Sequence, residues 1–351
     1  RYILDQMMKI FAEQKVDGVL IAGDVYDKTV PSAEAVQLFD EFITGLAKAE
    51  IPVYMISGNH DSSERLSFGR NLFKRSNLYI ASQFNQEIEK ITIKEDGYNI
   101  NFYMLPFVKP AYINHVLKIQ TETYEECFKH LMEQVKINED ETNILLAHQF
   151  VTVGKNSPEL SDSETSSLGG IDNIDYRLFD AFDYVALGHI HKPQAMGREM
   201  VRYAGSILKY SFSEIHKDKQ ATILTISKNK QISLSHHLLK PLRDMREMES
   251  LLKRKCEIGN EEDYMHVILT DEEQILDAIG KVRTVYPNVM QISFKNRRHM
   301  MQYETIQMKE NQIADQNPME LFEQFYKMQN HIDLDEKRAQ MAISIFEEVI
   351  R

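Results

Sequence analysis

The chain has 351 residues, of which 43% are hydrophobic, and a formal net charge of −12 at pH 7. These values describe a globular protein with a large core and a second, smaller domain, and they exclude disordered and fibrous classes. The negative charge argues against a protein that coats nucleic acid by bulk electrostatics. No apolar run reaches the length of about 18 residues that favours a membrane span. Two cysteines without metal-ligand spacing, Cys127 and Cys256, predict a reducing, cytoplasmic location.

The first third of the chain alternates between helical and strand patterns. Apolar spacing predicts helices over about 2–15, 32–48 and 63–75. Apolar runs over 18–22 and 52–57 follow the first two helices and predict strands. Such alternation predicts a layered α/β core with parallel strands.

The middle of the chain continues this sheet system. A hairpin is predicted over 86–105, and a helix over about 121–136 leads into a strand over 143–147 that ends on His148. A polar stretch over 154–170 is too long for a simple connection, and loops of that kind are often functional. Further strands are predicted over 183–188, 200–205, 219–227 and 231–239.

The pattern changes after Pro241. An α-β-α-β unit is predicted, with helices over about 243–255 and 272–284 and strands over 264–269 and 289–294. We therefore predict a first domain over 1–240, a second over 241–300 and amphipathic C-terminal helices over 318–351. Those helices carry apolar positions that look exposed: Leu321, Phe322, Phe325, Ile343 and Phe346.

Polar motifs stand at the ends of three apolar strands. They are Gly23-Asp-Val-Tyr-Asp27, Gly58-Asn-His-Asp61 and Gly188-His-Ile-His191. Side chains two residues apart on a strand point the same way, so the two histidines of the last motif can reach one centre. Open α/β sheets place their ligands at these strand ends. The first two motifs alone are more often turn chemistry and the third is more specific, but all three in this order predict a two-metal site for cleaving phosphate esters.

The residue types suggest individual roles. Asp24 is a good bridging carboxylate, and an amide oxygen from Asn59 and imidazoles from His148, His189 and His191 complete a mixed oxygen and nitrogen set suited to ions such as Mn²⁺. His60 adjoins a ligand but lies on the other side of its turn, which suits a general acid. Asp27 could hold the far nitrogen of that imidazole.

The ordered motifs resemble the calcineurin-like metallophosphoesterases. More narrowly, the whole chain resembles the SbcD family, the nuclease subunits of bacterial SbcCD DNA-processing complexes. The stretches that carry this narrower resemblance begin at Gly58, Ser161, Phe179, Tyr203 and Lys240.

The resemblance implies an Mn²⁺-dependent enzyme with 3′ to 5′ exonuclease action on double-stranded DNA ends and endonuclease action on hairpins, used in DNA recombination, replication and repair. It implies a homodimer whose C-terminal helices dock on an SbcC-type coiled-coil ATPase, and it makes the second domain a capping domain that grips DNA. It assigns Asp24 as the metal bridge, Asn59, His148 and His189 to one ion, His191 to the other, and His60 to catalysis with Asp27 as partner.

The family also carries Asp-x-His after a first strand, which this chain lacks. We expect residues upstream of Arg1 to supply it; otherwise the chain is a degenerate relative. Two alternatives to a DNA nuclease therefore remain. One is a phosphatase or phosphodiesterase of small substrates on the same fold, and the other is a non-catalytic scaffold.

Basic residues beside the motifs could contact DNA phosphates, although solvated surface charge is the more frequent reason for such residues. Those beside the motifs are Lys28, Arg65 and Arg70, and a small basic patch of the second domain adds Arg297 and Arg298. His236 and His237 are adjacent in a strand and should point to opposite faces, which favours a structural role.

Overall fold

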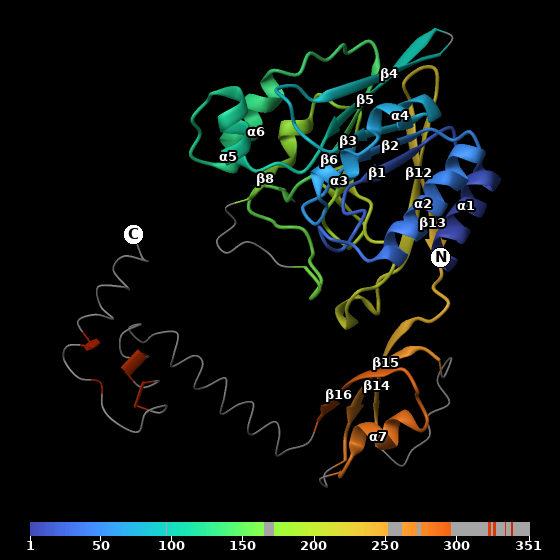
Figure 1. The fold of residues 1–351 in the computed structure, drawn as a ribbon, viewed down its shortest axis with the longest axis vertical. Helices are drawn as coiled ribbons and strands as arrows, with labels where there is room; N and C mark the ends of the chain where they lie inside the picture. Colours follow the sequence, from blue (N-terminus) through green and yellow to red (C-terminus); the bar gives the residue numbers. More distant parts are fainter. Residues whose placement is uncertain are drawn as a thin grey trace. The chain divides into compact units, whose positions relative to one another are not determined.

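A computed structural model describes residues 1–95, 97–164, 172–251, 262–271 and 275–295, with 322, 323, 326, 327, 334, 338 and 339. The chain divides into two compact units, Arg1–Arg246 and Glu247–Arg351 (Figure 1). Within the described residues, no helix is long and apolar enough to cross a membrane.

The first unit begins with a three-stranded parallel sheet of order β1-β2-β3, which the alternating pattern predicted. Its strands are β1 (Val19–Ala22), β2 (Val53–Ile56) and β3 (Leu78–Ala81). Helices α1 (Tyr2–Gln14) and α2 (Ala33–Lys48) lie beside this sheet (Figure 1). Their apolar stripes pack on it through a core that includes Phe11, Phe42 and Leu46.

A six-stranded sheet of order β10-β11-β9-β6-β5-β4 forms the second layer. Its strands are β4 (Glu89–Glu95), β5 (Tyr98–Leu105), β6 (Thr142–His148), β9 (Tyr184–Gly188), β10 (Gln194–Met196) and β11 (Arg198–Tyr203). Strands β5, β6 and β9 pair in parallel at its centre. Every residue of β6 is buried, as expected for a strand covered on both faces.

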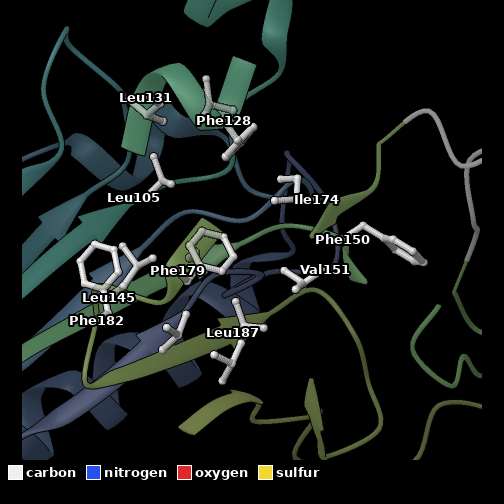
Figure 2. Close-up of a cluster of buried hydrophobic side chains, with 14 of the residues drawn as sticks. Leu105, Phe128, Leu131, Leu145, Phe150, Val151, Ile174, Phe179, Phe182 and Leu187 are labelled. Carbon is white, nitrogen blue, oxygen red and sulfur yellow. The ribbon is translucent and has the colours of Figure 1, made fainter. Parts of the chain in front are cut away.

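One face of this sheet is covered by helices α5 (Pro110–Leu117) and α6 (Tyr124–Glu133). Figure 2 shows the core beneath them, in which Phe128 and Leu131 of α6 join sheet residues such as Leu105, Leu145 and Leu187. Short strands β7 (Val151–Thr152) and β8 (Ile174–Asp175) close one side of this core.

The opposite face packs against the first sheet. Tyr54 of β2 stacks on Phe102 of β5 with ring centroids 4.1 Å apart, and Ile56, Met104 and Leu146 extend the shared core. This packing brings the carboxyl ends of β1, β2, β6 and β9 together. Apolar residues of the separate hairpin β12 (Lys219–Ile226) and β13 (Ile232–Leu239) pack against the same core.

The helix predicted over 63–75 is interrupted. The structure has α3 (Ser63–Ser67), α4 (Arg70–Phe73) and the 3₁₀ turn η1 (Lys74–Ser76). Gly69 separates α3 from α4 with a φ of 73°, a left-handed conformation that ends a helix.

The second unit holds a three-stranded sheet of order β14-β15-β16, from β14 (Met245–Ser250), β15 (Tyr264–Leu269) and β16 (Val289–Phe294), with helix α7 (Ala278–Arg283). The helix predicted over 243–255 is therefore wrong, because 245–250 is a strand. Met245 and Met248 have helical spacing, but pairing with β15 and burial of Met248 with Met265 and Val267 override local propensity.

His266 links the three strands of the second unit. Its Nδ1 lies 2.9 Å from Oε2 of Glu247, and its Nε2 lies 2.8 Å from Oγ of Ser293. The predicted contacts of Arg297, Arg298, Leu321, Phe325, Ile343 and Phe346 fall outside the described residues. Phe322 is described and lies half-buried in a helix.

Candidate metal centre

Donor atoms from four separate strand ends converge at one edge of the first unit. Ligand atoms of Asp24, His148 and His189 all lie within 4.8 Å of one another. Oδ1 of Asn59 lies 3.0 Å from Nε2 of His148 and 3.0 Å from Nδ1 of His189. The structure thus brings together four of the predicted metal ligands.

Two of these ligands stand on strained backbone. Asp24 has a φ of 48° and His189 a φ of 96°, both in the left-handed region that disfavours residues with a Cβ. Such conformations cost roughly 1–3 kcal/mol each and persist only where the surrounding structure imposes them. Asp24 and His189 each follow the end of a strand that is held in place by the packing of the two sheets. This packing imposes the strained backbone conformations that direct the two side chains to the site.

Glycines precede three of the donors because no larger residue fits. A Cβ added at Gly23 would meet His148 Nδ1 at 2.3 Å, and one at Gly58 would meet Asp24 Oδ1 at 2.0 Å. A Cβ at Gly188 would lie 1.8 Å from the carbonyl oxygen of Ala22. The glycines therefore let strand ends from both sheets approach closely enough for the donors to meet.

The hydrogen bonds of His148 decide which of its nitrogens faces the centre. Nδ1 lies 2.7 Å from the carbonyl oxygen of Ala22, and a carbonyl only accepts, so Nδ1 carries the proton. In the neutral ring the lone pair of Nε2 then points at Asn59 Oδ1 and at Asp24 Oδ2, the latter 3.2 Å away. Lone pairs facing one another repel unless a proton or a metal cation lies between them.

Burial keeps the second imidazole neutral. It lowers the pKa of His189 to about 4. Burial alone would raise the pKa of Asp24, but its contacts with the His148 ring and with the main-chain N–H of His60 outweigh that effect, so that pKa lies below its usual value. A neutral imidazole and an ionised carboxylate are the forms that bind metal. The donor set therefore fits a divalent ion.

The sequence analysis gave no role to Asp61, the last residue of its motif. Its buried carboxylate accepts hydrogen bonds from the main-chain N–H groups of Gly58 (2.8 Å), Tyr26 (3.0 Å) and Val25 (3.2 Å). Asp61 thereby ties the loop after β2 to the loop after β1. The sequence signal for this role is an aspartate three residues after Gly58, inside a turn, where its side chain can accept from nearby main-chain N–H groups.

His60 is exposed beside the donor group. Its main-chain N–H donates to Asp24 Oδ1 at 3.1 Å, and its ring Nδ1 lies 2.8 Å from the main-chain carbonyl oxygen of Asp27. Asp27 therefore contacts the imidazole through its backbone, which requires Nδ1 to carry a proton and leaves Nε2 as the atom that can meet a substrate.

His191 is not part of the group formed by Asp24, His148 and His189. Its Nδ1 lies 2.9 Å from Oγ of Ser163, in the 161–164 turn within the predicted polar stretch.

The predicted basic contacts differ in their surroundings. Lys28 and Arg65 are exposed, whereas a guanidinium nitrogen of Arg70 lies 3.6 Å from Glu89. His236 of β13 lies within hydrogen-bonding distance of Arg202 of β11 and of Gln220 and Thr222 of β12, which agrees with the structural role predicted for it.

Comparison with known proteins shows the family of the chain. Residues 1–193 match the calcineurin-like phosphoesterase family, and residues 236–330 match the type 5 capsule protein repressor C-terminal domain. The chain is 33% identical over 336 residues to the SbcD subunit of the nuclease SbcCD from Staphylococcus epidermidis, covering 93% of this chain and 86% of that protein. The chain therefore belongs to the calcineurin-like phosphoesterase family and, within it, to the SbcD family. It is a hydrolytic enzyme of the phosphodiesterase type.

Two solved structures were also matched. TT1561 of Thermus thermophilus has 12% identity and a TM-score of 0.37, covering 67% of this chain and 92% of that one. Phosphopantetheinyl hydrolase of Mycobacterium tuberculosis has 14% identity and a TM-score of 0.29, covering 52% and 76%.

Replacing Gly58 should weaken metal binding, because an added Cβ would also meet the main-chain nitrogen of Asp24 at 2.4 Å and so shift that residue as a whole. In Gly58→Ala the new Cβ displaces the Asp24 carboxylate, and we expect Mn²⁺ affinity to fall roughly 10- to 100-fold by isothermal titration calorimetry. Gly18→Ala is the matched control, since its Cβ would meet Tyr54 at an ordinary 3.4 Å. Equal affinity of wild type and Gly58→Ala would show that the close approach does not position the ligand.

Acid should destabilise the metal-free protein through His189. Between pH 6.5 and about 4 the unfolded imidazole binds a proton that the folded one does not, so stability is lost as pH falls through this window. At about 1.4 kcal/mol per pH unit, this lowers the free energy of unfolding by roughly 3 kcal/mol.

Urea unfolding in EDTA across this pH range measures the effect. His189→Gln should show a correspondingly shallower pH dependence, whereas the exposed His130→Gln should follow wild type. Parallel curves for wild type and His189→Gln would refute the assignment.

Proposed function

We propose that the chain is a metal-dependent DNA nuclease subunit with the double-strand 3′ to 5′ exonuclease and hairpin endonuclease activities that its family resemblance implies. The observation that carries the proposal is the convergence of Asp24, Asn59, His148 and His189 beside the exposed ring of His60. Oxygen and imidazole donors in this mixture suit Mn²⁺.

The proposed chemistry divides between the bound ions and the chain. Two divalent ions, when bound, would activate a water and neutralise charge on the phosphate. Asp24, Asn59, His148 and His189 would hold one of these ions, and Asp24 with His191 would contribute to holding the other. His60 takes part through Nε2 in its imidazolium form, which carries a proton on each nitrogen, donating the Nε2 proton to the departing oxygen or as a hydrogen bond to the phosphate. The carbonyl of Asp27 orients that ring by accepting from Nδ1.

DNA contacts are proposed for exposed cations near the site. Lys28 and Arg65 can meet backbone phosphates directly, while Arg70 would have to exchange its contact with Glu89. In the second unit, the proposed DNA contacts are Arg297 and Arg298.

The proposed assembly is a homodimer bound to an SbcC-type coiled-coil ATPase in the cytoplasm. Exposed apolar side chains of Phe68 (81%) and Leu72 (67%), around α3 and α4, support a protein contact there. Light scattering would measure the mass of the dimer, and a monomeric mass would contradict it.

The proposed ATPase-docking segment is residues 318–351, with the apolar positions Leu321, Phe322, Phe325, Ile343 and Phe346. Undiminished co-purification of the ATPase after deletion of this segment would contradict the assignment.

The substrate class can be tested with the full-length protein and Mn²⁺. We expect release of nucleotides from linear duplex DNA and cutting of hairpins. Efficient turnover of para-nitrophenyl phosphate with inert DNA would indicate a phosphatase, and no turnover of either, with or without the ATPase, would indicate a scaffold.

Removing the proposed acid should separate binding from catalysis. We expect His60→Ala to lower the rate of DNA hydrolysis roughly 10²- to 10⁴-fold, the usual scale of acid–base catalysis, while metal binding is nearly unchanged. His130→Ala, at an exposed site, should match wild type. Loss of bound Mn²⁺ from His60→Ala in calorimetry would make His60 a ligand instead.

A further inference from the structure

Two stretches that carried the narrower family resemblance, 161–164 and 203–214, meet at His191. The main-chain N–H of His191 donates to Glu164 Oε1 at 2.6 Å. Its main-chain carbonyl accepts from Lys219 Nζ at 2.9 Å and from the N–H of Ser206 at 2.9 Å. With Nδ1 beside Ser163, ring Nε2 is the one polar atom of His191 to which no described residue gives a hydrogen bond.

The direction of the hydrogen bonds from Glu164 to His191 follows from counting protons. A carboxylate only accepts, so the hydroxyl of Ser161 donates to Glu164 Oε2, 2.9 Å away. Having used its proton, Ser161 accepts from the hydroxyl of Ser163, 2.8 Å away. Ser163 has then used its own proton and must accept from His191 Nδ1, 2.9 Å away. Each hydroxyl holds one proton, so the carboxylate sets the direction of the whole chain.

We propose that Glu164 is a positioning residue that acts through Ser161 and Ser163 to place the proton of His191 on Nδ1, so that the lone pair of Nε2 is presented to a metal. This inference rests on the proposed function, because it assigns that lone pair to the second metal position. His191 is thus prepared separately from His148, whose tautomer is set by the carbonyl of Ala22.

A buried ion pair between Lys219 and Glu214 fixes the main-chain carbonyl of His191. Lys219 and Glu214 have side chains only 3% and 2% exposed and are in direct contact. Lys219 also donates to Ser206 Oγ at 2.7 Å and to the His191 carbonyl. Glu214 is the last residue of the 3₁₀ turn η4 (Phe212–Glu214), and its carboxylate accepts from the N–H of Tyr210 at 2.8 Å. A buried charge pair is stable only when its remaining donors and acceptors are satisfied, which is the case here.

The 161–164 turn and the segment that holds the Lys219–Glu214 ion pair are joined by hydrogen bonds. The N–H of Asp162 donates to Ser213 Oγ at 2.9 Å, and Ser213 Oγ lies 2.7 Å from Ser211 Oγ beside Glu214. The 161–164 turn and the segment around η4 therefore form a closed set of contacts around His191. Ordering of this kind around a ligand typically contributes about 10- to 100-fold to metal affinity.

The tautomer can be read directly by NMR. In metal-free protein labelled with ¹⁵N-histidine, we expect the neutral ring of His191 to carry its proton on Nδ1 in wild type. Ser163→Ala and Glu164→Gln should give a mixture with protonated Nε2, and Ser163→Thr, which keeps the hydroxyl, should restore the wild-type state. Unchanged tautomers in Ser163→Ala and Glu164→Gln would overturn the proposal whatever the metal does.

Calorimetry with Mn²⁺ on the full-length protein tests the consequence. Wild type should bind two ions, and Ser163→Ala and Glu164→Gln should keep one and bind the other about 10- to 100-fold more weakly. The matched controls Ser235→Ala and Glu133→Gln, which also remove groups lying beside histidines, should bind as wild type does. A wild type that binds one ion would refute the two-metal part of the proposed function, and the NMR result would still decide the role of Glu164. Two ions bound equally well by all variants would overturn the inference alone.

Discussion

At the candidate metal centre, the lone pairs of oxygen and nitrogen donor atoms point at one another. The oxygens of Asp24 and Asn59 face the unprotonated nitrogen of His148, and His189, whose pKa is lowered by burial, faces the same amide oxygen. Such an arrangement is unfavourable by itself and becomes favourable when a cation occupies the centre. The shared core between the two sheets, the glycines at the strand ends and the left-handed backbone of Asp24 and His189 all maintain it.

Much of this centre could be predicted from the sequence, because its chemistry is local. Each donor directly follows an apolar run, and parallel strands bring such ends to one edge of a sheet. The order of the motifs is therefore enough to predict that Asp24, Asn59, His148 and His189 lie together. The proton positions could not be predicted, since the carbonyls of Ala22 and Asp27 become partners only through tertiary packing.

The misses have similar causes. The segment 245–250 has helical spacing of its methionines, yet its pairing partner β15 lies far enough along the chain that no local pattern reveals it. The helix over 63–75 is interrupted by Gly69, a residue whose effect depends on whether its φ is positive. Asp61, Glu164 and Lys219 act on backbone groups, and a sequence motif does not show which backbone groups a side chain will reach.

The central claim is that donors from four strand ends share a metal. Anomalous diffraction at the manganese edge from crystals of the full-length protein soaked in Mn²⁺ measures this most directly. The account predicts an anomalous peak in coordination contact with Asp24, Asn59, His148 Nε2 and His189 Nδ1. Peaks only elsewhere on the molecule, with these four side chains still facing one another, would contradict it.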